Sequence, residues 1–327
     1  MITVVGEAVM DLMRSGQGGT TAHPGGSPAN VAVGLGRLGN DVALLTRLGP
    51  DAHGTELARH LVGSGVALPA GVVDRHPTST AIAHTDESGS ATYEFAITWQ
   101  LPDLEPDGLL AGSACLHTGS IAATLEPGAS TVRRLVERAR GRRTVSYDPN
   151  CRPSLMGDPA RARTRIESLV ASADVVKASD EDLGWLRPGQ DVVDVAREWL
   201  ALGPSLVVVT RGAAGAVGVC RAGTVERRAR RVAVADTVGA GDAFMAGLLD
   251  ALNRRDLLGL DNADRLYGID TGTLAELLDA ATLVSSFTCT RPGANPPTTE
   301  ELAAYRAGIR SGASAGSRSG IWPHRPE

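Results

Sequence analysis

The sequence predicts an α/β fold: a parallel β-sheet covered by helices on both faces, with a small separate β-sheet attached at one edge. Along most of the 327 residues, apolar runs of strand length alternate with amphipathic runs of helix length, which is the pattern of a covered parallel sheet. Two stretches, about residues 8–22 and 72–98, each contain strand-like runs and no helical pattern. They predict the small sheet, as a flap or a dimerisation surface.

The first strand and the first helix have clear signals. "ITVVGE", residues 2–7, is typical of a buried strand. "SPANVAVGLGRLGN" predicts a helix: Ser27 is a good N-cap, Pro28 suits the first helical position, and Gly39-Asn40 can end it.

The alternation continues with a strand at 41–49 and a helix at 53–65, and residues 78–97 then interrupt it. Here "TSTAIAHTDESGSATYEFAI" has two β-rich runs around turn residues 86–90. This pattern indicates a hairpin rather than a strand–helix unit.

The remaining elements return to strand–helix order. We expect strands at residues 113–120, 143–150, 174–179 and 205–210, with helices at 128–141, 160–173 and 191–202. The basic run "VERRARRVAV" is interpreted as a solvated strand edge. The domain is expected to span residues 1–310, and the Ser-, Gly- and Arg-rich residues 311–327 to be a disordered tail.

Bulk composition excludes several classes of partner. The net charge is −5, which gives no reason to expect nucleic acid or an anionic membrane as partner. No apolar run approaches the ~18–20 residues of a membrane span, and the N-terminus lacks a basic region and a cleavage site. We therefore expect a cytoplasmic protein.

The most informative stretch is "ADTVGAGDAFMAGLLDAL", residues 235–252, where a helix begins with almost no side chains. N–H groups in a first helical turn lack internal partners, and with the helix dipole they form an anion site. A phosphate can approach Gly239, Ala240 and Gly241 closely. Asp242 beside them can take a proton from a hydroxyl that attacks phosphorus. Alone, the motif also fits a Gly-rich helix start capped by Asp.

Weaker signals lie elsewhere along the chain. Asn30, after paired glycines, can bond two hydroxyl groups, although an ordinary loop and cap fit equally well. Asp11 follows the first strand, where α/β sheets bind ligands. Arg152 follows the strand of "YDPNCRP" and can neutralise phosphate, or simply lie on the surface. Thr210 and Gly212 end an apolar strand over which a nucleotide could lie.

Together these segments resemble the ribokinase-like (PfkB) carbohydrate kinases over roughly residues 2–310. The most specific parts are "GGSPANVAVGLGRLG" and "DTVGAGDAFMAGLL", while "YDPNCRP" and "CTRPGANPP" are most similar to the fructokinase branch. The resemblance implies a three-layer α/β/α sandwich with a small β-sheet lid over the sugar. It also implies ATP and Mg²⁺, with a sugar hydroxymethyl group as acceptor.

The resemblance assigns roles by motif position. It implies Asp242 as catalytic base beside an anion hole of Gly239, Ala240 and Gly241; substrate contacts from Asp11, Gly25, Gly26, Asn30 and Arg152; and ATP contacts from Lys177, Ser179, Thr210 and Gly212. Asp236 and the loop around Gly293 match the family's monovalent-cation site, where K⁺ is expected.

One motif departs from the family. Where members often carry N-x-x-E, this chain has Ser179 and Asp182. Because serine reaches less far than asparagine, Mg²⁺ contacts near Asp182 are expected to run through water.

The expected activity is phosphorylation of fructose to fructose 6-phosphate. The nearest alternative is 2-keto-3-deoxygluconate kinase, whose acceptor needs a cation such as Arg75 or Arg152. A nucleoside kinase would favour an aromatic clamp, and only 3% of residues are aromatic. A catalytically silent sugar or nucleotide sensor would have no use for the base. A homodimer through the lid is the expected assembly.

Overall fold

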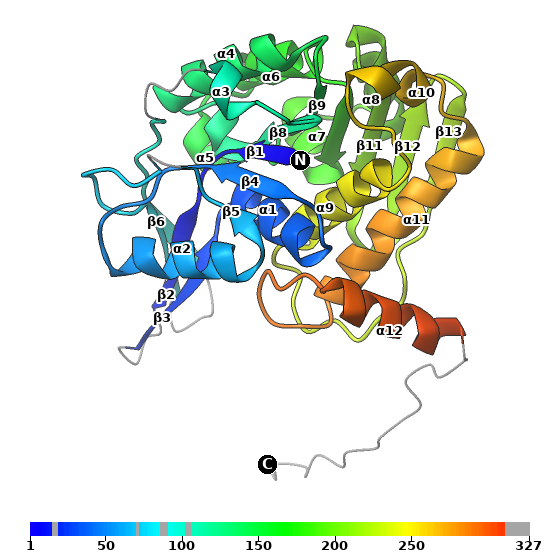
Figure 1. The fold of residues 1–327 in the computed structure, drawn as a ribbon. Helices are drawn as coiled ribbons and strands as arrows, with labels where there is room; N and C mark the ends of the chain where they lie inside the picture. Colours follow the sequence, from blue (N-terminus) through cyan, green and yellow to red (C-terminus); the bar gives the residue numbers. More distant parts are fainter. Residues whose placement is uncertain (15–18, 70–71, 86–90, 102–105, 311–327) are drawn as a thin grey trace.

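Two β-sheets form the framework of the chain in this computed structural model (Figure 1). The structure describes residues 1–14, 19–69, 72–85, 91–101 and 106–310. The expected hairpin turn at 86–90 and the expected tail at 311–327 lie outside the described residues.

The main sheet has nine strands, and those from β11 to β5 run parallel. Its order is β13 (Gly223–Arg227), β12 (Ala216–Cys220), β11 (Leu206–Thr210), β10 (Val175–Ser179), β9 (Thr144–Asp148), β8 (Cys115–Gly119), β1 (Ile2–Val5), β4 (Val42–Leu45) and β5 (Val66–Ala67). β12 and β13 are antiparallel, which the alternation did not predict. Their short connections fit hairpins, whereas parallel neighbours need a long crossover.

Helices cover both faces of this sheet, as predicted. One face packs on α1 (Ser27–Arg37), α2 (Ala52–Gly63), α9 (Ala240–Asn253), α10 (Ala263–Tyr267) and α11 (Thr271–Thr288). The other packs on α3 (Pro106–Leu109), α4 (Gly128–Ala139), α5 (Pro153–Met156), α6 (Pro159–Val170), α7 (Asp180–Leu186) and α8 (Val192–Leu202). Neighbouring strand residues alternate between the two cores: Val208 belongs to the first, Val207 and Val209 to the second.

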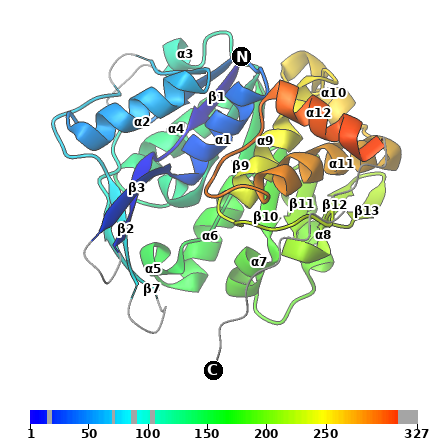
Figure 2. The ribbon, with the colours of Figure 1, turned by 90° about the horizontal axis from the view of Figure 1, so that it is seen from below.

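The second sheet confirms that the two helix-free stretches form a separate layer. Its order is β3 (Thr20–Gly25), β2 (Val9–Arg14), β6 (Thr80–Thr85) and β7 (Ala91–Ala96). β6 and β7 are antiparallel, as the hairpin prediction requires, while β2 runs parallel to β6. Figure 2 shows β2, β3 and β7 together at one side of the molecule.

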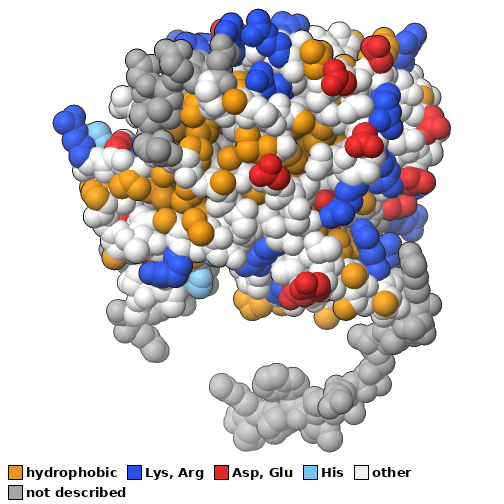
Figure 3. All heavy atoms as spheres, viewed as in Figure 1, with side chains coloured by type: hydrophobic (Ala, Val, Ile, Leu, Met, Phe, Trp, Pro, Cys, Tyr) orange, Lys and Arg blue, Asp and Glu red, His pale blue; other side chains and the backbone are white. Residues whose placement is uncertain are grey.

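Helix α12 (Thr299–Arg310) lies at the C-terminal end of the described chain, with Leu302 packed near Leu38 and Leu283. Short 3₁₀ turns occur at Ser120–Ala123, Gly212–Ala214 and Leu260–Asn262. On the face in Figure 3, basic side chains gather along the top, over α4 and α6, and mix with acidic ones on the right. Within the described ranges, no helix has the length and apolar character to cross a membrane.

Candidate active site

The start of α9 is the centre of the site. Gly239 caps the helix in the left-handed conformation, with φ 73°, which favours glycine. A Cβ at this position would lie 2.5 Å from Cβ of Ala294, so a side chain here meets both strain and a clash. The N–H of Ala240 donates to the carbonyl oxygen of Thr237 at 3.1 Å. The helix itself supplies no acceptor for the N–H groups of Gly241 and Asp242.

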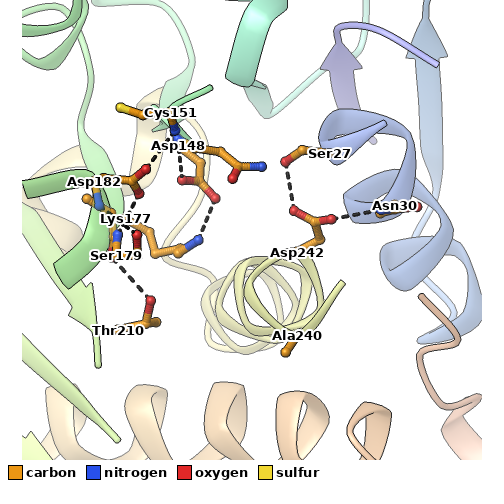
Figure 4. Close-up of polar contacts among 12 residues, drawn as sticks. Ser27, Asn30, Asp148, Cys151, Lys177, Ser179, Asp182, Thr210, Ala240 and Asp242 are labelled. Carbon is orange, nitrogen blue, oxygen red and sulfur yellow. Dashed lines mark hydrogen bonds and ion pairs between the residues drawn. The ribbon is translucent and has the colours of Figure 1, made fainter. Parts of the chain in front are cut away.

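Asp242 is held by helix α1. Ser27 donates its hydroxyl to Oδ1 at 2.7 Å, and Asn30 donates from Nδ2 to Oδ2 at 2.8 Å (Figure 4). Asp242 is only 8% exposed. The prediction that Ser27 is the N-cap was wrong: Gly26 is the N-cap, and Ser27 is the first helical residue. Its hydroxyl bonds the carboxylate instead of the helix backbone.

The two glycines before α1 allow Asp11 and the backbone to approach each other. A Cβ on Gly25 would lie 2.1 Å from Oδ2 of Asp11, and a Cβ on Gly26 would lie 2.5 Å from the carbonyl oxygen of Glu7. Gly26 also has φ 98°. Asp11 therefore lies against the entrance to the helix that carries Asn30, as the sequence predicted for one common site.

The charge of Arg152 acts on Asp11. Burial raises the pKa of Asp11 to about 6; the charges of Arg152 and His23 oppose this rise, and that of Asp242 adds to it. The guanidinium of Arg152 also donates to Oδ1 of Asn150 at 2.7 Å. Asp11, Arg152 and Asp242 are thus near enough to influence one another.

Lys177 and Asp148 form a buried ion pair on the other side of Asp242. Nζ of Lys177 lies 2.7 Å from Oδ2 of Asp148. Burial raises the pKa of Asp148 to about 6, with Lys177 opposing the rise. Burial alone lowers the pKa of Lys177, but the Asp148 carboxylate outweighs it and the pKa is raised. Both groups are therefore ionised at neutral pH.

The same ammonium group lies beside the start of α9. A Cβ on Gly241 would come 3.2 Å from Nζ of Lys177. The missing side chain thus leaves a cation next to the amides of the first turn. Lys177 was expected along the nucleotide, and the structure brings it to the helix start.

Ser179 and Asp182 form a capping box at the start of α7. The side chain of Ser179 accepts from the N–H of Asp182, and Oδ2 of Asp182 accepts from the N–H of Ser179. Oδ1 of Asp182 accepts from the N–H of Cys151 at 2.6 Å. Both carboxylate oxygens therefore already serve backbone donors. The described residues contain no group of three or more His, Cys, Asp or Glu side chains that could hold a metal ion.

Thr210 and Gly212 lie at the end of β11, along the same edge of the sheet. Thr210 donates its hydroxyl to the carbonyl oxygen of Ala178 at 3.3 Å. A Cβ on Gly212 would meet no atom within 4 Å. The flat base of a nucleotide would require such open space over the backbone of Gly212.

Asp236 and the loop around Gly293 do come together. Oδ2 of Asp236 accepts from the N–H of Gly293 at 2.8 Å, and Oδ1 accepts from the N–H of Val238 at 3.0 Å. These donors lower the pKa of Asp236. Since Ala294 touches Gly239, this loop directly supports the helix start.

Sequence reasoning assigned no role to two members of the site, Ser27 and Asp148. Ser27 precedes Asn30 by three positions, so both lie on one face of α1. This spacing was the available signal for Ser27. Asp148 ends β9, and a carboxylate ending one strand beside a lysine in the next expected strand was the signal for the ion pair.

A carboxylate beside the amides of a Gly-rich helix start, at the carboxyl edge of a parallel sheet, is typical of α/β enzymes that transfer phosphoryl groups. The sequence pattern described as pfkB family carbohydrate kinase matches residues 1–301. The chain belongs to this family, and it is a phosphotransferase that acts on a sugar hydroxyl.

Similar proteins agree in sequence and fold. A fructokinase of Klebsiella pneumoniae is 38% identical over 262 residues, covering 77% of this chain and 84% of the relative. A crystal structure of a Xylella fastidiosa fructokinase with bound ATP has a TM-score of 0.83 at 26% identity and covers 96% of this chain and 99% of that one. A fructokinase double mutant of Vibrio cholerae O395, bound to fructose, ADP and potassium ion, has a TM-score of 0.74 at 28% identity, covering 94% and 97%.

Proposed function

We propose that this chain is a fructokinase, which uses ATP to phosphorylate the 6-hydroxyl group of fructose. The observation that carries the proposal is the setting of Asp242, a buried carboxylate in the first turn of α9 beside amides and the Lys177 ammonium. The fructokinase relatives, and the related structure with fructose and ADP, support this sugar and this donor.

In the proposed reaction, Asp242 accepts the proton of the attacking sugar hydroxyl. The γ-phosphoryl group passes to the oxygen in line, and the N–H groups of Gly239, Ala240 and Gly241 stabilise the charge on its oxygens. The N–H of Ala240 also serves Thr237, so Gly241 and its neighbours carry most of this task. Lys177 adds positive charge beneath them.

The sugar lies on the side of the small sheet. Asp11 and Asn30 bond its hydroxyl groups, and Arg152 completes the pocket. Gly25 and Gly26 contribute by leaving room for Asp11 and the backbone of Glu7. Asn30 already donates to Asp242, and its side-chain oxygen remains for a sugar hydroxyl. We propose that the small sheet, from about 8–22 and 72–98, is a lid that excludes water.

The nucleotide extends from the start of α9 towards Ser179, Thr210 and Gly212. Asp182 does not fit as a direct Mg²⁺ ligand, because both of its oxygens accept backbone N–H groups. If Mg²⁺ is bound together with the triphosphate, Asp182 would contact it through water, and the ion would neutralise phosphate charge. We expect K⁺ at the loop of Asp236 and Gly293, but both oxygens of Asp236 already accept backbone N–H groups, so carbonyl oxygens of the loop would have to hold the ion.

Asp242→Asn tests the proposal most directly. The amide cannot accept the proton, so kcat should fall by about 10²–10⁴-fold with unchanged folding. Asp250→Asn is the matched control, because Asp250 lies on the same helix and is also 8% exposed. Near wild-type turnover of Asp242→Asn in a coupled ADP-release assay would sink the assignment.

A sugar panel in the same assay distinguishes the rivals. Arg152 beside Asp11 suits the carboxylate of 2-keto-3-deoxygluconate as well as a hydroxyl group, so that sugar acid belongs in the panel with nucleosides. A silent sensor would bind ligand without releasing ADP.

We also propose that the enzyme acts in the cytoplasm, where ATP is available. We propose that it forms a homodimer through the lid, which light scattering tests.

A further inference from the structure

The hydroxyl of Ser27 bonds the carboxylate of Asp242 across 215 positions of sequence. Ser27 is 7% exposed, so water does not compete freely for this bond. Because an ionised carboxylate only accepts, the hydroxyl must donate its single hydrogen. This contact joins the first turn of α1 to the first turn of α9.

Ser27 and Asn30 hold the carboxylate in one orientation. They lie on one face of α1 and each donates to a different oxygen of Asp242, as Figure 4 shows. Helices α1 and α9 pack closely at Gly34, where an added Cβ would lie 2.6 Å from Cβ of Ala246. The carboxylate therefore can neither rotate nor shift without breaking one of these bonds.

Ser27 and Asn30 differ in how easily each can give up its hydrogen bond to Asp242. Asn30 donates from a planar amide group, whereas a serine hydroxyl can turn about its Cβ–Oγ bond to another acceptor. A hydrogen bond to a carboxylate favours its ionised form. When the bond from Ser27 is given up, Oδ1 is free, and the carboxylate becomes a stronger proton acceptor.

We propose that Ser27 is a positioning residue for the proton acceptor: its hydroxyl holds Oδ1 of Asp242 in a fixed orientation until the sugar hydroxyl takes its place. The inference rests on the proposed function and adds a role for a residue outside the proposed nucleotide and metal contacts. Asn30 keeps Oδ2 fixed throughout the exchange.

Other charged groups also face Asp242. They are Lys177 from β10, Asp148 from β9, and Asp11 from β2 with Arg152 close to it. Burial raises the pKa of Asp11 and of Asp148 to about 6, so both titrate near the acidic limb of a rate profile. Removal of the Ser27 hydroxyl leaves these groups in place. A difference in the acidic limb between wild type and variant therefore reports the bond from Ser27 to Asp242.

The experiment measures kcat/KM for fructose against pH in Ser27→Ala. The acidic limb reports protonation of the essential proton acceptor, and it should move upward by about one pH unit, since hydrogen bonds to charged groups have that strength. Ser27→Gly should give the same shift, and Ser27→Thr should return the limb towards wild type. Ser113→Ala is the control, because Ser113 is equally buried and bonds only the carbonyl oxygen of Cys115.

A uniform loss of rate with an unmoved limb in Ser27→Ala and Ser27→Gly would overturn the inference. Melting temperatures identify any variant that fails to fold, and the remaining one of the pair then decides. The proposed function fails separately: in that case wild-type protein releases no ADP with fructose at any pH.

Discussion

Glu7 is a buried carboxyl group where the chain leaves the main sheet for the small one. It is 4% exposed, and Oε2 accepts from the N–H of Ala122 at 3.1 Å. Burial raises its pKa from the ordinary 4.5 to about 7, against opposing hydrogen bonds and the charge of Arg152. Between these two values the folded state binds more protons than the unfolded state. Stability therefore falls as pH rises through this window.

Glu7→Gln should remove this loss, because a neutral amide keeps an acceptor for Ala122 without a buried charge. The shift from 4.5 to about 7 corresponds to roughly 3 kcal/mol, so we expect the variant to gain about 1–3 kcal/mol of unfolding free energy at pH 8 and little at pH 4.5. Urea unfolding at both pH values measures this. Glu56→Gln, an exposed change, should show no such difference, and an equal effect of Glu7→Gln at both pH values would contradict the prediction.

Single residues differ in how far local sequence predicts them. The role of Asp242 can be predicted from local sequence, because a Gly-rich helix start and a carboxylate are adjacent in the chain. The partner of Ser27 lies 215 positions away; the spacing to Asn30 places Ser27 on the same helix face but does not identify that partner. A serine before a proline at a helix start favours an N-cap, and a one-residue shift of the helix reverses that interpretation.

At the scale of elements, α1 and α9 form the support of the site. Gly34 lets them approach, since a Cβ there would lie 2.6 Å from Cβ of Ala246. Gly34→Ala should push the helices apart and lengthen the bonds from Ser27 and Asn30 to Asp242. We expect a loss of about 1–3 kcal/mol in unfolding free energy and a decrease in kcat of about ten- to a hundredfold.

Steady-state kinetics and urea unfolding of Gly34→Ala test this geometry. Gly63→Ala is the matched control: Gly63 is also helical, and a Cβ there meets nothing within 4 Å. It should keep wild-type kcat and gain about 0.5–1 kcal/mol from alanine's helix preference. If Gly34→Ala behaves like this control, close helix packing does not position the carboxylate.

Most elements could be predicted because their signals are local. The buried strands and the β6–β7 hairpin follow from periodicity and turn residues. The antiparallel pair β12–β13 was missed, because an apolar run alone carries no direction. The capping box of Ser179 and Asp182 shows why the family's N-x-x-E can be replaced here: serine and aspartate at this spacing still start a helix and hold the N–H of Cys151.

At the scale of the whole molecule, the sequence could not predict how the two sheets are joined. β2 pairs with β6 across seventy positions, as Met10 with Thr80, and no local pattern specifies that register. The joint depends on Arg47, just after β4, whose side chain is 1% exposed. Its guanidinium donates to the carbonyl oxygens of His76 and Pro77 before β6 and of Thr98 after β7, and it pairs with Asp74 at 2.7 Å.

Arg47→Met tests whether this single side chain fixes the small sheet on the main one. The variant removes the guanidinium that pairs with Asp74 and donates to three carbonyl oxygens, so we expect unfolding free energy to fall by roughly 3–5 kcal/mol. Arg59→Met is the control, because Arg59 pairs with Glu56 on the surface and is 67% exposed; its effect should stay within about 0.5 kcal/mol. Because both ends of the β6–β7 pair lose their anchor, kcat/KM for fructose should also fall in Arg47→Met at temperatures where the variant remains folded. Unchanged stability and unchanged kcat/KM would mean that strand pairing alone holds the small sheet over the sugar site.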